Sequence, residues 1–490
     1  MKNINCITVD LGATSGRVIL TRSNNGNLDT EIIHRFPNSP FKFNNRYYWN
    51  IYSLFDNIKE GLRMAAQKEP NISSLGVDTW GVDIVYVGKD GSFLDLPRAY
   101  RDPYTNEAME EVFSIIPKEE LYQKTGIQFM NFNTLFQLYA AKKEGMEALK
   151  YTDKALFMPD AISYMLTGKQ VCEYTILSTS QLLNPMTKEI ETDFLDRLGL
   201  RTDLFPEVVM PGTQIGTLLP DLAEEVGLGE IPVIAVAGHD TASAIAAIPA
   251  LGKDFAYISS GTWSLIGIES EEPIIHKESF DKNFTNEGGI NGTTRFLKNV
   301  TGLWLLEQCL KAWKREGREY TYPQIVAMAE SMQDNKVYID PDHALFANPD
   351  SMPAAIRKYC SQTGQRAPES DTEFIRCIFE SLALKYAVVL EYLKEMASFD
   401  IKKLHIIGGG SQNELLNQFA ANASGLEVIA GPSEATAYGN ALIQLKTLGV
   451  YQTIEEMRSG LVDSLSLKHY QPQARADWET KVNEFKKITF

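Results

Sequence analysis

Residues 5–20 read NCITVDLGATSGRVIL, an apolar run that breaks at Asp10 and resumes at Arg17. Two runs of aliphatic and β-branched residues joined by a glycine-containing loop predict a β-hairpin. The loop, residues 12–16, has small side chains and several backbone N–H groups, which suit it to surround phosphate oxygens. An ordinary hairpin turn has the same composition. The stretch therefore predicts a hairpin and leaves a phosphate site as one of two interpretations.

The same pattern recurs in the second half of the chain. Residues 256–267 read AYISSGTWSLIG, again a strand, a turn of glycine and hydroxyl residues that includes Thr262, and a strand. A third turn, Gly408-Gly409-Gly410, follows the apolar run 404–407 and precedes a helix predicted over 414–424. Its glycines let the backbone approach a ribose or ring closely, and the helix start favours anions. One glycine-bearing hairpin in each half indicates a duplicated α/β fold with a cleft between the halves.

The length of the chain also favours two domains. The chain has 490 residues, whereas a single hydrophobic core stops growing at roughly 250–300 residues. We expect the boundary near 246–255, which gives an N-terminal domain, 1–247, and a C-terminal domain, 248–490. Hydrophobic spacing predicts further helices and strands. These are helices over 49–64, 241–248, 300–313 and 381–396, a mostly helical stretch over 105–200, and strands over 75–78, 82–87 and 233–236.

Charge and cysteine content exclude several classes of function. The formal net charge is -16, so the chain lacks the basic face that nucleic acid requires. The most apolar long window, residues 231–251, is interrupted by polar residues at 238–241 and is not expected to span a membrane. We expect no signal peptide, because no basic segment followed by an apolar one opens the chain. Five widely spaced cysteines without a CxxC pair indicate a reducing cytoplasm and argue against a zinc site.

Asp240 is the candidate general base. The strand predicted over 233–236 leads into AGHDT at 237–241, which places this acidic residue among small neighbours at a strand end. Phosphoryl transfer to an alcohol needs a carboxylate that accepts the hydroxyl proton and orients the oxygen. The alternative is that Asp240 only caps the helix predicted over 241–248. The cap interpretation does not account for the adjacent His239.

Three further positions are candidates for metal or sugar contacts. Asp10, at the end of the first strand, is placed to orient Mg²⁺ or its waters, since Mg²⁺ takes few carboxylates. Trp80, within DTWGVD at 78–83, is either an apolar wall for a sugar or a core residue, with the acidic residues of that stretch bonding hydroxyls. Asn299 either caps the helix predicted over 300–313 or presents its amide to the sugar.

Two more segments carry a family likeness: PDAISYMLTG at 159–168 and GGGSQN at 408–413. With the hairpin loops, they make the chain similar, over nearly its whole length, to the FGGY carbohydrate kinases of the actin, hexokinase and Hsp70-like ATPase superfamily. The resemblance implies an α/β, two-domain actin-like ATPase (ribonuclease H-like) fold with a catalytic cleft between the halves. It also implies ATP and Mg²⁺ as cofactors.

Within this family, four motifs resemble those of the rhamnulokinase subgroup: DLGATSGR at 10–17, DTWGVD at 78–83, HDT at 239–241 and NVTGLW at 299–304. The resemblance implies that Asp240 is the base. The residues that it implies for the sugar are Gly81, His239, Asp240, Thr241 and Asn299. The residues that it implies for ATP are Ala13, Thr14, Ser15, Gly16, Arg17, Thr262, Glu307 and Gly409.

Two stretches depart from the family pattern. Residues 134–138, TLFQL, lack the lysine and tryptophan that usually follow the threonine of the first family signature, a variant that suits the rhamnulokinase subgroup. Glu307 stands where close relatives have a glutamine on the nucleotide side, and an added carboxylate is unfavourable near phosphates.

The reaction implied by the resemblance converts L-rhamnulose and ATP to L-rhamnulose 1-phosphate and ADP. The enzyme is expected to be a cytoplasmic monomer or homodimer without nucleic-acid or membrane partners. A kinase for another ketose, such as L-fuculose or a xylulose, is the alternative within the class. A non-enzymatic sugar sensor usually adds a helix-turn-helix, for which there is no room before the loop at residue 10. An actin-like ATPase that drives assembly has no need of a sugar base at Asp240.

Overall fold

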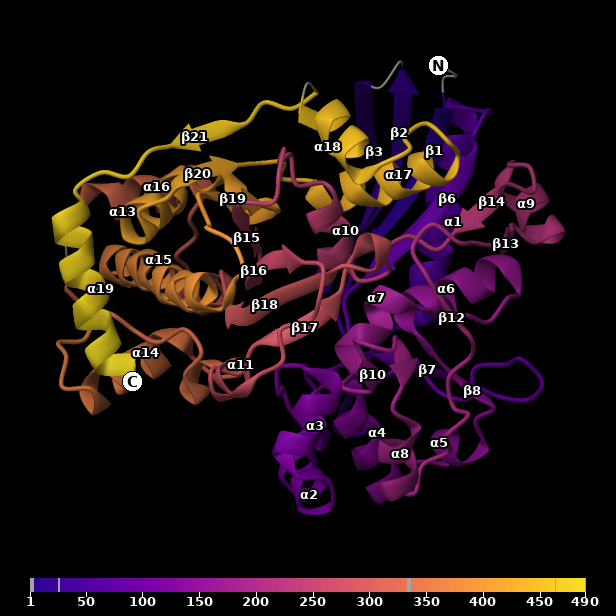
Figure 1. Ribbon diagram of the computed structural model, residues 1–490, viewed down its shortest axis with the longest axis horizontal. Coiled ribbons are helices and arrows are strands. Elements are labelled where there is room, and N and C mark those ends of the chain that lie inside the picture. Colours follow the sequence, from indigo (N-terminus) through magenta and orange to yellow (C-terminus); the bar gives the residue numbers. More distant parts are fainter. Residues whose placement is uncertain (1–3, 25–26, 333–335, 463, 490) are drawn as a thin grey trace. The chain divides into compact units, whose positions relative to one another are not determined.

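The computed structural model describes residues 4–24, 27–332, 336–462 and 464–489 (Figure 1). The chain divides into two compact units, and the first change of unit falls at Leu251, inside the stretch 246–255. Two later segments return to the first unit. The predicted division into 1–247 and 248–490 stays a prediction about sequence domains. Unit 1 is Met1–Leu251, Glu269–Phe296 and Ala435–Ser464, and unit 2 is Gly252–Ile268, Leu297–Glu434 and Leu465–Phe490.

A six-stranded sheet with the order β13-β14-β6-β1-β2-β3 forms the centre of unit 1. β1 is parallel to β6 and β6 is parallel to β14, whereas the other neighbours are antiparallel. Every residue of β6, and every residue of β1 from Cys6 to Leu11, is buried, so both faces of these strands are covered. The strands are β1 (Ile4–Leu11), β2 (Ser15–Asn24), β3 (Asn27–Pro37), β6 (Ser74–Thr79), β13 (Gln214–Thr217) and β14 (Pro232–Ile234).

Helices pack against this sheet. α1 (Ile51–Lys68) is capped by Asn50, whose Oδ1 accepts the Ser53 N–H at 3.0 Å, and it packs against β2 and β3. α17 (Ala435–Thr447) packs against β1 and β6 and also against α10 (Asp240–Ala246). α17 thus joins the central strands to the helix that begins with the candidate base.

The remaining elements of unit 1 are short. Its other helices are α2 (Ala108–Ile115), α3 (Lys118–Thr125), α4 (Thr134–Lys143), α5 (Glu147–Tyr151), α6 (Met158–Thr167), α7 (Tyr174–Leu177), α8 (Thr192–Arg197), α9 (Pro220–Val226), α11 (Lys277–Asp281), α18 (Ile454–Val462) and the 3-10 turns Pro103–Thr105, Ser178–Ser180 and Ile290–Gly292. Its other strands are β4 (Phe41–Phe43), β5 (Arg46–Tyr48), β7 (Ile84–Val87), β8 (Lys154–Phe157), β9 (Cys172–Glu173), β10 (Leu183–Asn184), β11 (Glu189–Ile190), β12 (Val208–Val209) and β17 (Thr285–Gly288).

A seven-stranded sheet has the order β17-β18-β16-β15-β19-β20-β21, and its last four strands lie wholly in unit 2. β15 is antiparallel to β16 and parallel to β19. In unit 2, α16 and α19 both pack against the long helix α15 (Figure 1). The strands are β15 (Phe255–Ser260), β16 (Trp263–Ser270), β18 (Thr294–Thr301), β19 (Lys403–Ile407), β20 (Glu427–Ala430) and β21 (Lys468–Tyr470). The helices are α12 (Trp304–Arg315), α13 (Tyr322–Ser331), α14 (Met352–Gln362), α15 (Asp371–Met396), α16 (Glu414–Ser424), α19 (Arg475–Thr489) and the 3-10 turns Ala344–Phe346 and Gly409–Gln412.

Both hairpins predicted from the sequence are confirmed, as β1–β2 and β15–β16, and the helix predicted over 414–424 is confirmed as α16. The helix predicted over 381–396 starts ten residues too late. α15 begins at Asp371 and is buried without interruption from Phe374 to Leu390, so it lacks the one-sided spacing that marks a surface helix.

The helix predicted over 300–313 also starts elsewhere. Asn299 lies in β18, and α12 begins at Trp304 with Leu303 as its N-cap. The interpretation of Asn299 as a helix cap is therefore wrong, because the β-branched residues that follow it extend a strand.

No helix within the described ranges is long and apolar enough to cross a membrane. All five cysteines are free and buried. Burial raises the pKa of Cys6 to about 12 and that of Cys360 to about 11, which keeps both as unreactive thiols.

Candidate active site

Three parallel strands of unit 1 end at one edge of the sheet, and each has a candidate residue near or just after its end. Asp10 lies near the end of β1, Gly81 follows β6, and Asp240 follows β14. Thr79 and His239 form a parallel bridge that continues the β6–β14 pairing beyond the named strands. Carboxyl ends of parallel strands in open α/β sheets are where ligands usually bind. The structure thus gathers these unit 1 candidates at one sheet edge.

The loop between β1 and β2 holds its carbonyl groups on one side. Asn38 Nδ2 donates to the carbonyl oxygen of Gly12 at 2.8 Å, and the Asn38 N–H donates to that of Thr14 at 3.1 Å. In a planar trans peptide the next N–H points opposite to the carbonyl. The N–H groups of Ala13 and Ser15 therefore point away from Asn38. Such an arrangement can receive anionic oxygens.

The base of this loop is fixed by one ion pair and one close contact. Asp10 and Arg17 are opposite each other in the β1–β2 register, and the Arg17 guanidinium donates to the Asp10 carboxylate. A Cβ on Gly16 would lie 2.2 Å from a ring carbon of Phe36, so only glycine fits there. The close packing of the loop on β3 is therefore enough to explain why residue 16 is a glycine.

Asp78 adds a buried carboxyl group beside Asp10. The two residues are register partners in the β1–β6 pair, and Asp78 is fully buried. Burial, followed by the negative charge of Asp10, raises the pKa of Asp78 well above its ordinary value. Its Oδ2 accepts the Asn440 Nδ2–H of α17 at 2.6 Å. Asp78 is therefore an enclosed anchor for α17, which argues against the interpretation that it bonds sugar hydroxyls.

A polar network continues from Asp78 along α17. Asn440 Oδ1 accepts hydrogen bonds from Thr8 Oγ1 at 3.2 Å and from Gln444 Nε2 at 2.7 Å. Gln444 Nε2 also donates to the carbonyl oxygen of Ile7, while its Oε1 accepts the Ser74 hydroxyl at 2.7 Å. These buried bonds fix the position of α17 on β1 and β6, because unpaired polar groups there would be costly.

Asp240 opens α10 but is not its N-cap. The N-cap is His239, and Asp240 Oδ1 accepts the N–H of Thr241 at 2.5 Å and its hydroxyl at 3.1 Å. The Asp240 side chain is 31% exposed. Within the described residues, no hydrogen bond reaches its Oδ2. The cap interpretation of Asp240 is therefore wrong, and a carboxylate oxygen is available for chemistry.

Glu173 fixes the backbone just before His239. Its Oε2 accepts the N–H of Gly238 at 2.9 Å and the hydroxyl of Thr175 at 2.6 Å. Thr175 Oγ1 in turn accepts the N–H of His239 at 3.2 Å. Burial raises the pKa of Glu173 to about 6, against the opposing effect of these hydrogen bonds. No local pattern in the sequence marks this contact, because Glu173 is 65 residues from Gly238.

The ring of His239 is held from the other side by Arg295. Arg295 Nη2 lies 3.1 Å from His239 Nδ1 and 3.1 Å from Glu287 Oε2. His239 Nε2 lies 3.5 Å from Asp240 Oδ1. Arg295 is fully buried and His239 is 8% exposed. The ring thus lies between a buried cation and the candidate base.

The turn after β6 is strained beside these residues. Val82 has a φ of 68°, which is a genuine outlier for a β-branched residue and costs about 1–3 kcal/mol. Its N–H donates to Thr179 Oγ1 at 3.2 Å, and its carbonyl accepts the Thr134 hydroxyl at 2.7 Å. A Cβ on the preceding Gly81 would lie 3.4 Å from His239 Nε2. Strain of this kind concentrates at functional sites.

Trp80 and Asp83 belong to the core of unit 1. Asp83 accepts the indole N–H groups of Trp80 and Trp49 at 2.9 and 2.6 Å, the N–H of Tyr100 at 3.2 Å and the Gln137 amide at 3.0 Å. Trp80 is 6% exposed, and its ring centroid lies 4.2 Å from that of Trp49. Of the two interpretations of Trp80, the structure supports the core residue. Asp83 is likewise a structural acceptor.

The corresponding turn of unit 2, between β15 and β16, also has its carbonyls bound. The carbonyl of Thr262 accepts N–H groups from Gly302 at 3.0 Å and Trp304 at 3.2 Å, and that of Gly261 accepts the N–H of Leu303 at 2.9 Å. By the same trans-peptide argument, the Thr262 N–H points away from the start of α12. The two hairpin loops are therefore alike, because in each of them neighbouring residues donate hydrogen bonds to the carbonyl groups.

The other nucleotide candidates of unit 2 lie near this turn or on the next strand. Thr262 Oγ1 donates to Glu307 Oε1 at 3.3 Å, so Glu307 contacts the loop. Gly409 is exposed, and the space at its Cβ position is open. A Cβ on the neighbouring Gly410 would lie 2.0 Å from Ser260 Oγ. The glycine turn therefore lies directly against the end of β15.

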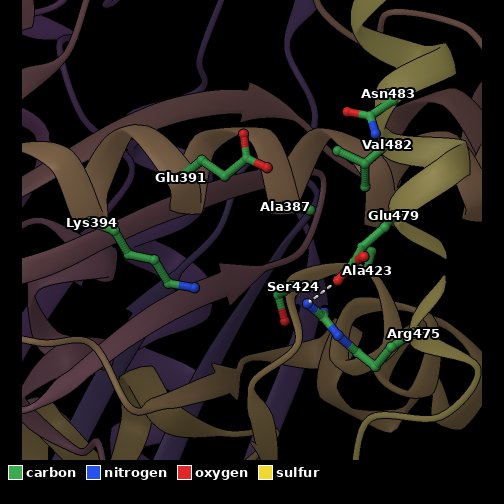
Figure 2. A pocket seen from close by; sticks show the side chains of 9 residues that line it. All are labelled: Ala387, Glu391, Lys394, Ala423, Ser424, Arg475, Glu479, Val482 and Asn483. Atoms are coloured by element: carbon green, nitrogen blue, oxygen red, sulfur yellow. Dashed lines mark hydrogen bonds and ion pairs between the residues drawn. The ribbon is translucent and has the colours of Figure 1, made fainter.

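A separate hollow of about 340 Å³ lies among α15, α16 and α19 of unit 2 (Figure 2). Arg475 and Glu479, four residues apart on α19, form an ion pair at 2.9 Å. Burial and the Arg475 charge lower the pKa of Lys394. It contains none of the predicted site residues, and its charges are mixed. Its lining residues are Ala387, Glu391, Lys394, Ala423, Ser424, Arg475, Glu479, Val482 and Asn483.

Several known proteins are similar to this chain in sequence or in fold. Residues 5–247 match the N-terminal domain and residues 256–448 the C-terminal domain of the FGGY family of carbohydrate kinases. A rhamnulokinase from Bacteroides thetaiotaomicron is 52% identical over 482 residues, which cover 98% of this chain and 99% of that protein. The chain belongs to the FGGY family of carbohydrate kinases. It is a carbohydrate kinase, with ATP and a sugar as substrates, and the predicted family is confirmed.

Two further comparisons bear on this FGGY kinase. A rhamnulokinase from Oceanobacillus iheyensis is 40% identical over 464 residues, which cover 95% of this chain and 97% of that protein. A gluconate kinase from Lactobacillus acidophilus has a solved structure that matches with a TM-score of 0.82 at 15% identity, over 99% of this chain and 98% of that one. The latter likeness concerns the fold alone, and it confirms the predicted two-domain α/β architecture.

Proposed function

We propose that this carbohydrate kinase transfers the γ-phosphoryl group of ATP to the 1-hydroxyl of L-rhamnulose, giving L-rhamnulose 1-phosphate and ADP. The observation that carries the proposal is the 52% identity, over 98% of the chain, to a protein named rhamnulokinase. The arrangement at the β1–β6–β14 edge is compatible with it, because a carboxylate and a histidine lie together there.

In this proposal Asp240 accepts the proton of the sugar hydroxyl as the phosphoryl group is transferred. Its partial exposure and its remaining carboxylate oxygen support this role, since a base must reach the hydroxyl directly. The further sugar contacts that we propose are Gly81, His239, Thr241 and Asn299. Hydrogen bonds to hydroxyl groups discriminate sharply between epimers, because a wrong epimer leaves buried polar groups unpaired.

We assign ATP to the two hairpin loops and the glycine turn. The outward N–H groups of the first loop, and that of Thr262, support phosphate binding, since fixed backbone dipoles stabilise charge on the transferring group. Glu307 would act through Thr262, to which it is hydrogen-bonded. The ATP residues proposed are Ala13, Thr14, Ser15, Gly16, Arg17, Thr262, Glu307 and Gly409.

We propose Mg²⁺ as the metal and Asp10 as the residue that holds it or its waters. Kinase magnesium ions are held by one or two carboxylates together with phosphates and water. Over the part of the chain that the structure describes, no cluster of three or more His, Cys, Asp or Glu side chains could enclose a metal ion. The carboxylate that we propose for the ion is that of Asp10, which lies at the base of the phosphate loop and is ion-paired to Arg17. When bound, it would neutralise charge on the β- and γ-phosphates.

We also propose that the enzyme works in the cytoplasm, as a monomer or homodimer that takes only small molecules. Free, buried cysteines support a reducing compartment. The net charge of -16 argues against nucleic acid as a partner.

A panel of ketoses in an assay coupled to ADP release tests the proposed substrate. L-rhamnulose should give the highest kcat/KM, its C4 epimer L-fuculose a value at least ~10²-fold lower, and D-xylulose little activity. Equal values for L-rhamnulose and L-fuculose would reject the substrate while leaving the kinase assignment intact.

A further inference from the structure

Arg295 is a buried cation whose hydrogen bonds constrain one histidine. It lies in β18, one residue after the strand begins, and none of its side chain is exposed. Its Nε donates to the carbonyl oxygen of Gly288 at 2.8 Å, which fixes the guanidinium against the end of β17. Nη2 then faces both Glu287 Oε2 and His239 Nδ1, each at 3.1 Å. The contact with His239 is a hydrogen bond, whereas the contact with Glu287 is an ion pair.

This geometry decides which nitrogen of His239 carries the ring proton. A guanidinium has donors only and stays protonated in proteins. Nδ1, at hydrogen-bond distance from Nη2, must therefore accept. Glu287 Oε2 is the only other group shown near Nδ1 among the described residues, and at 3.5 Å it is too distant to compete well for a proton there. The ring proton is then on Nε2.

The protonated nitrogen faces the candidate base. His239 Nε2 lies 3.5 Å from Asp240 Oδ1. It also lies 3.4 Å from the position that a Cβ on Gly81 would occupy. Both residues belong to the proposed sugar site. An Nε2–H donor at this point can hold a sugar oxygen next to the carboxylate that takes its proton.

We propose that Arg295 is a positioning residue that holds His239 as the Nε2–H tautomer, so that an N–H donor faces the sugar beside Asp240. The role of that donor rests on the proposed function, whereas the tautomer does not. Because Arg295 is fully buried, it acts through His239 and does not touch the substrate. Histidine tautomers are commonly set in this way, by the bond that the other ring nitrogen makes.

Nitrogen NMR of histidine-labelled protein tests the tautomer directly. The chain has six histidines, so His239→Gln assigns the resonances of His239 by difference. In the wild type, Nε2 should be protonated and Nδ1 bare. In Arg295→Met, the population with the proton on Nδ1 should rise, whereas Arg295→Lys, which keeps a cationic donor, should resemble the wild type. A wild-type proton on Nδ1, or an unchanged tautomer in Arg295→Met, would overturn the inference.

Two further variants separate positioning from folding. Arg376 of unit 2 is another buried arginine, 7% exposed and paired with Glu380 at 2.7 Å, so Arg376→Met controls for the loss of a buried ion pair. It should leave the His239 resonances unchanged. If Arg295→Met fails to fold because Glu287 loses its cation, Arg295→Met with Glu287→Gln removes both charges together.

Kinetics supply the second readout. Arg295→Met should lower kcat/KM for the sugar by ~10–100-fold, the usual effect of removing a group that orients a histidine, with KM for ATP unchanged. In the His239→Gln background the same change should have little further effect. An equal loss in both backgrounds would contradict action through His239. A wrong sugar assignment would leave the NMR result standing, and an active kinase with an Nδ1–H histidine would reject this inference alone.

Discussion

A methyl group on Gly439 of α17 would lie 1.7 Å from the carbonyl oxygen of Ser243 in α10. The contact is backbone to backbone, so no side-chain rotation can relieve it. Because α10 begins with Asp240, the packing of these two helices also sets the position of the proposed base. Gly439 is thus a packing requirement of the site.

Gly439→Ala should therefore impair both stability and catalysis. Overpacking of a tight contact typically costs 1–3 kcal/mol, which should lower the melting temperature. A displacement of about 1 Å at the base can reduce kcat by ~10²-fold. Gly229→Ala is the matched control, because the Cβ position there is open and its φ is not in the left-handed region. A Gly439→Ala enzyme with wild-type melting and kcat would show that α10 is not held by this contact.

Asp240→Asn tests the base itself. The amide cannot accept the hydroxyl proton, so kcat should fall by at least ~10²-fold while ATP affinity and melting temperature stay near wild type. Steady-state kinetics and nucleotide titration measure these quantities. Asp221→Asn is the control, since Asp221 is an exposed acidic residue in the first turn of another short helix of unit 1, α9. A near wild-type kcat in Asp240→Asn would mean that Asp240 has only a structural role.

The parts of the site that the sequence predicts are those with a local signal. A glycine turn between two β-branched runs identifies each hairpin, because turn geometry depends on adjacent residues. Asp240 also has a local signal, because it is an acidic residue at the end of an apolar strand. Thr262 and Gly409 lie in such turns, and the structure places both beside the end of β15 or of its parallel neighbour β19.

The residues that the sequence does not reveal contact the site over long separations. Asn440 meets Asp78 across 362 residues, and Arg295 meets His239 across 56. Polar side chains within a strand or helix have no periodicity that marks their partner. The left-handed Val82 was equally unpredictable, because its β-branched side chain favours extended backbone. Tertiary hydrogen bonds from Thr134 and Gln137 to its carbonyl, and from its N–H to Thr179, stabilise that conformation.

Glu173→Gln should loosen the backbone before His239. Glu173 accepts from Gly238, Thr175 and Ile176 at 2.6–3.0 Å, and a glutamine places an N–H₂ group among these donors. One buried donor then loses its acceptor, which costs about 1–3 kcal/mol. We expect a lower melting temperature, and a larger fall in kcat/KM for the sugar than in that for ATP.

A buried glutamate in unit 2 provides the control for this change. Glu380 is fully buried and pairs with Arg376 at 2.7 Å and Lys481 at 2.9 Å. Glu380→Gln should also lower the melting temperature but should not change the ratio of the two kcat/KM values. The same ratio in both variants would mean that Glu173 has no particular role at His239.

Asp83 should make stability depend on pH in an unusual direction. Burial raises the pKa of Asp83 to about 7, above its ordinary value of 3.8, although four hydrogen bonds to it oppose the shift. Between these two values the folded protein binds a proton that the unfolded chain has released. The contribution of Asp83 to stability is therefore fully present below about pH 4 and is lost as the pH rises through 7, with a slope of up to about 1.4 kcal/mol per pH unit.

Urea unfolding of unit 1, followed by tryptophan fluorescence at pH 5 and pH 7.5, measures this loss, and the difference between the wild type and Asp83→Asn isolates it from other groups. The stability of the wild type relative to Asp83→Asn should be greater at pH 5. Asp90→Asn serves as a control without pH dependence in this range. Hydrogen bonds from Ser92 lower the pKa of the exposed Asp90 below its ordinary value of 3.8, so the difference between the wild type and Asp90→Asn should be the same at pH 5 and pH 7.5. A difference between wild type and Asp83→Asn that is the same at pH 5 and pH 7.5 would mean that the four donors outweigh burial and that Asp83 is charged in the core.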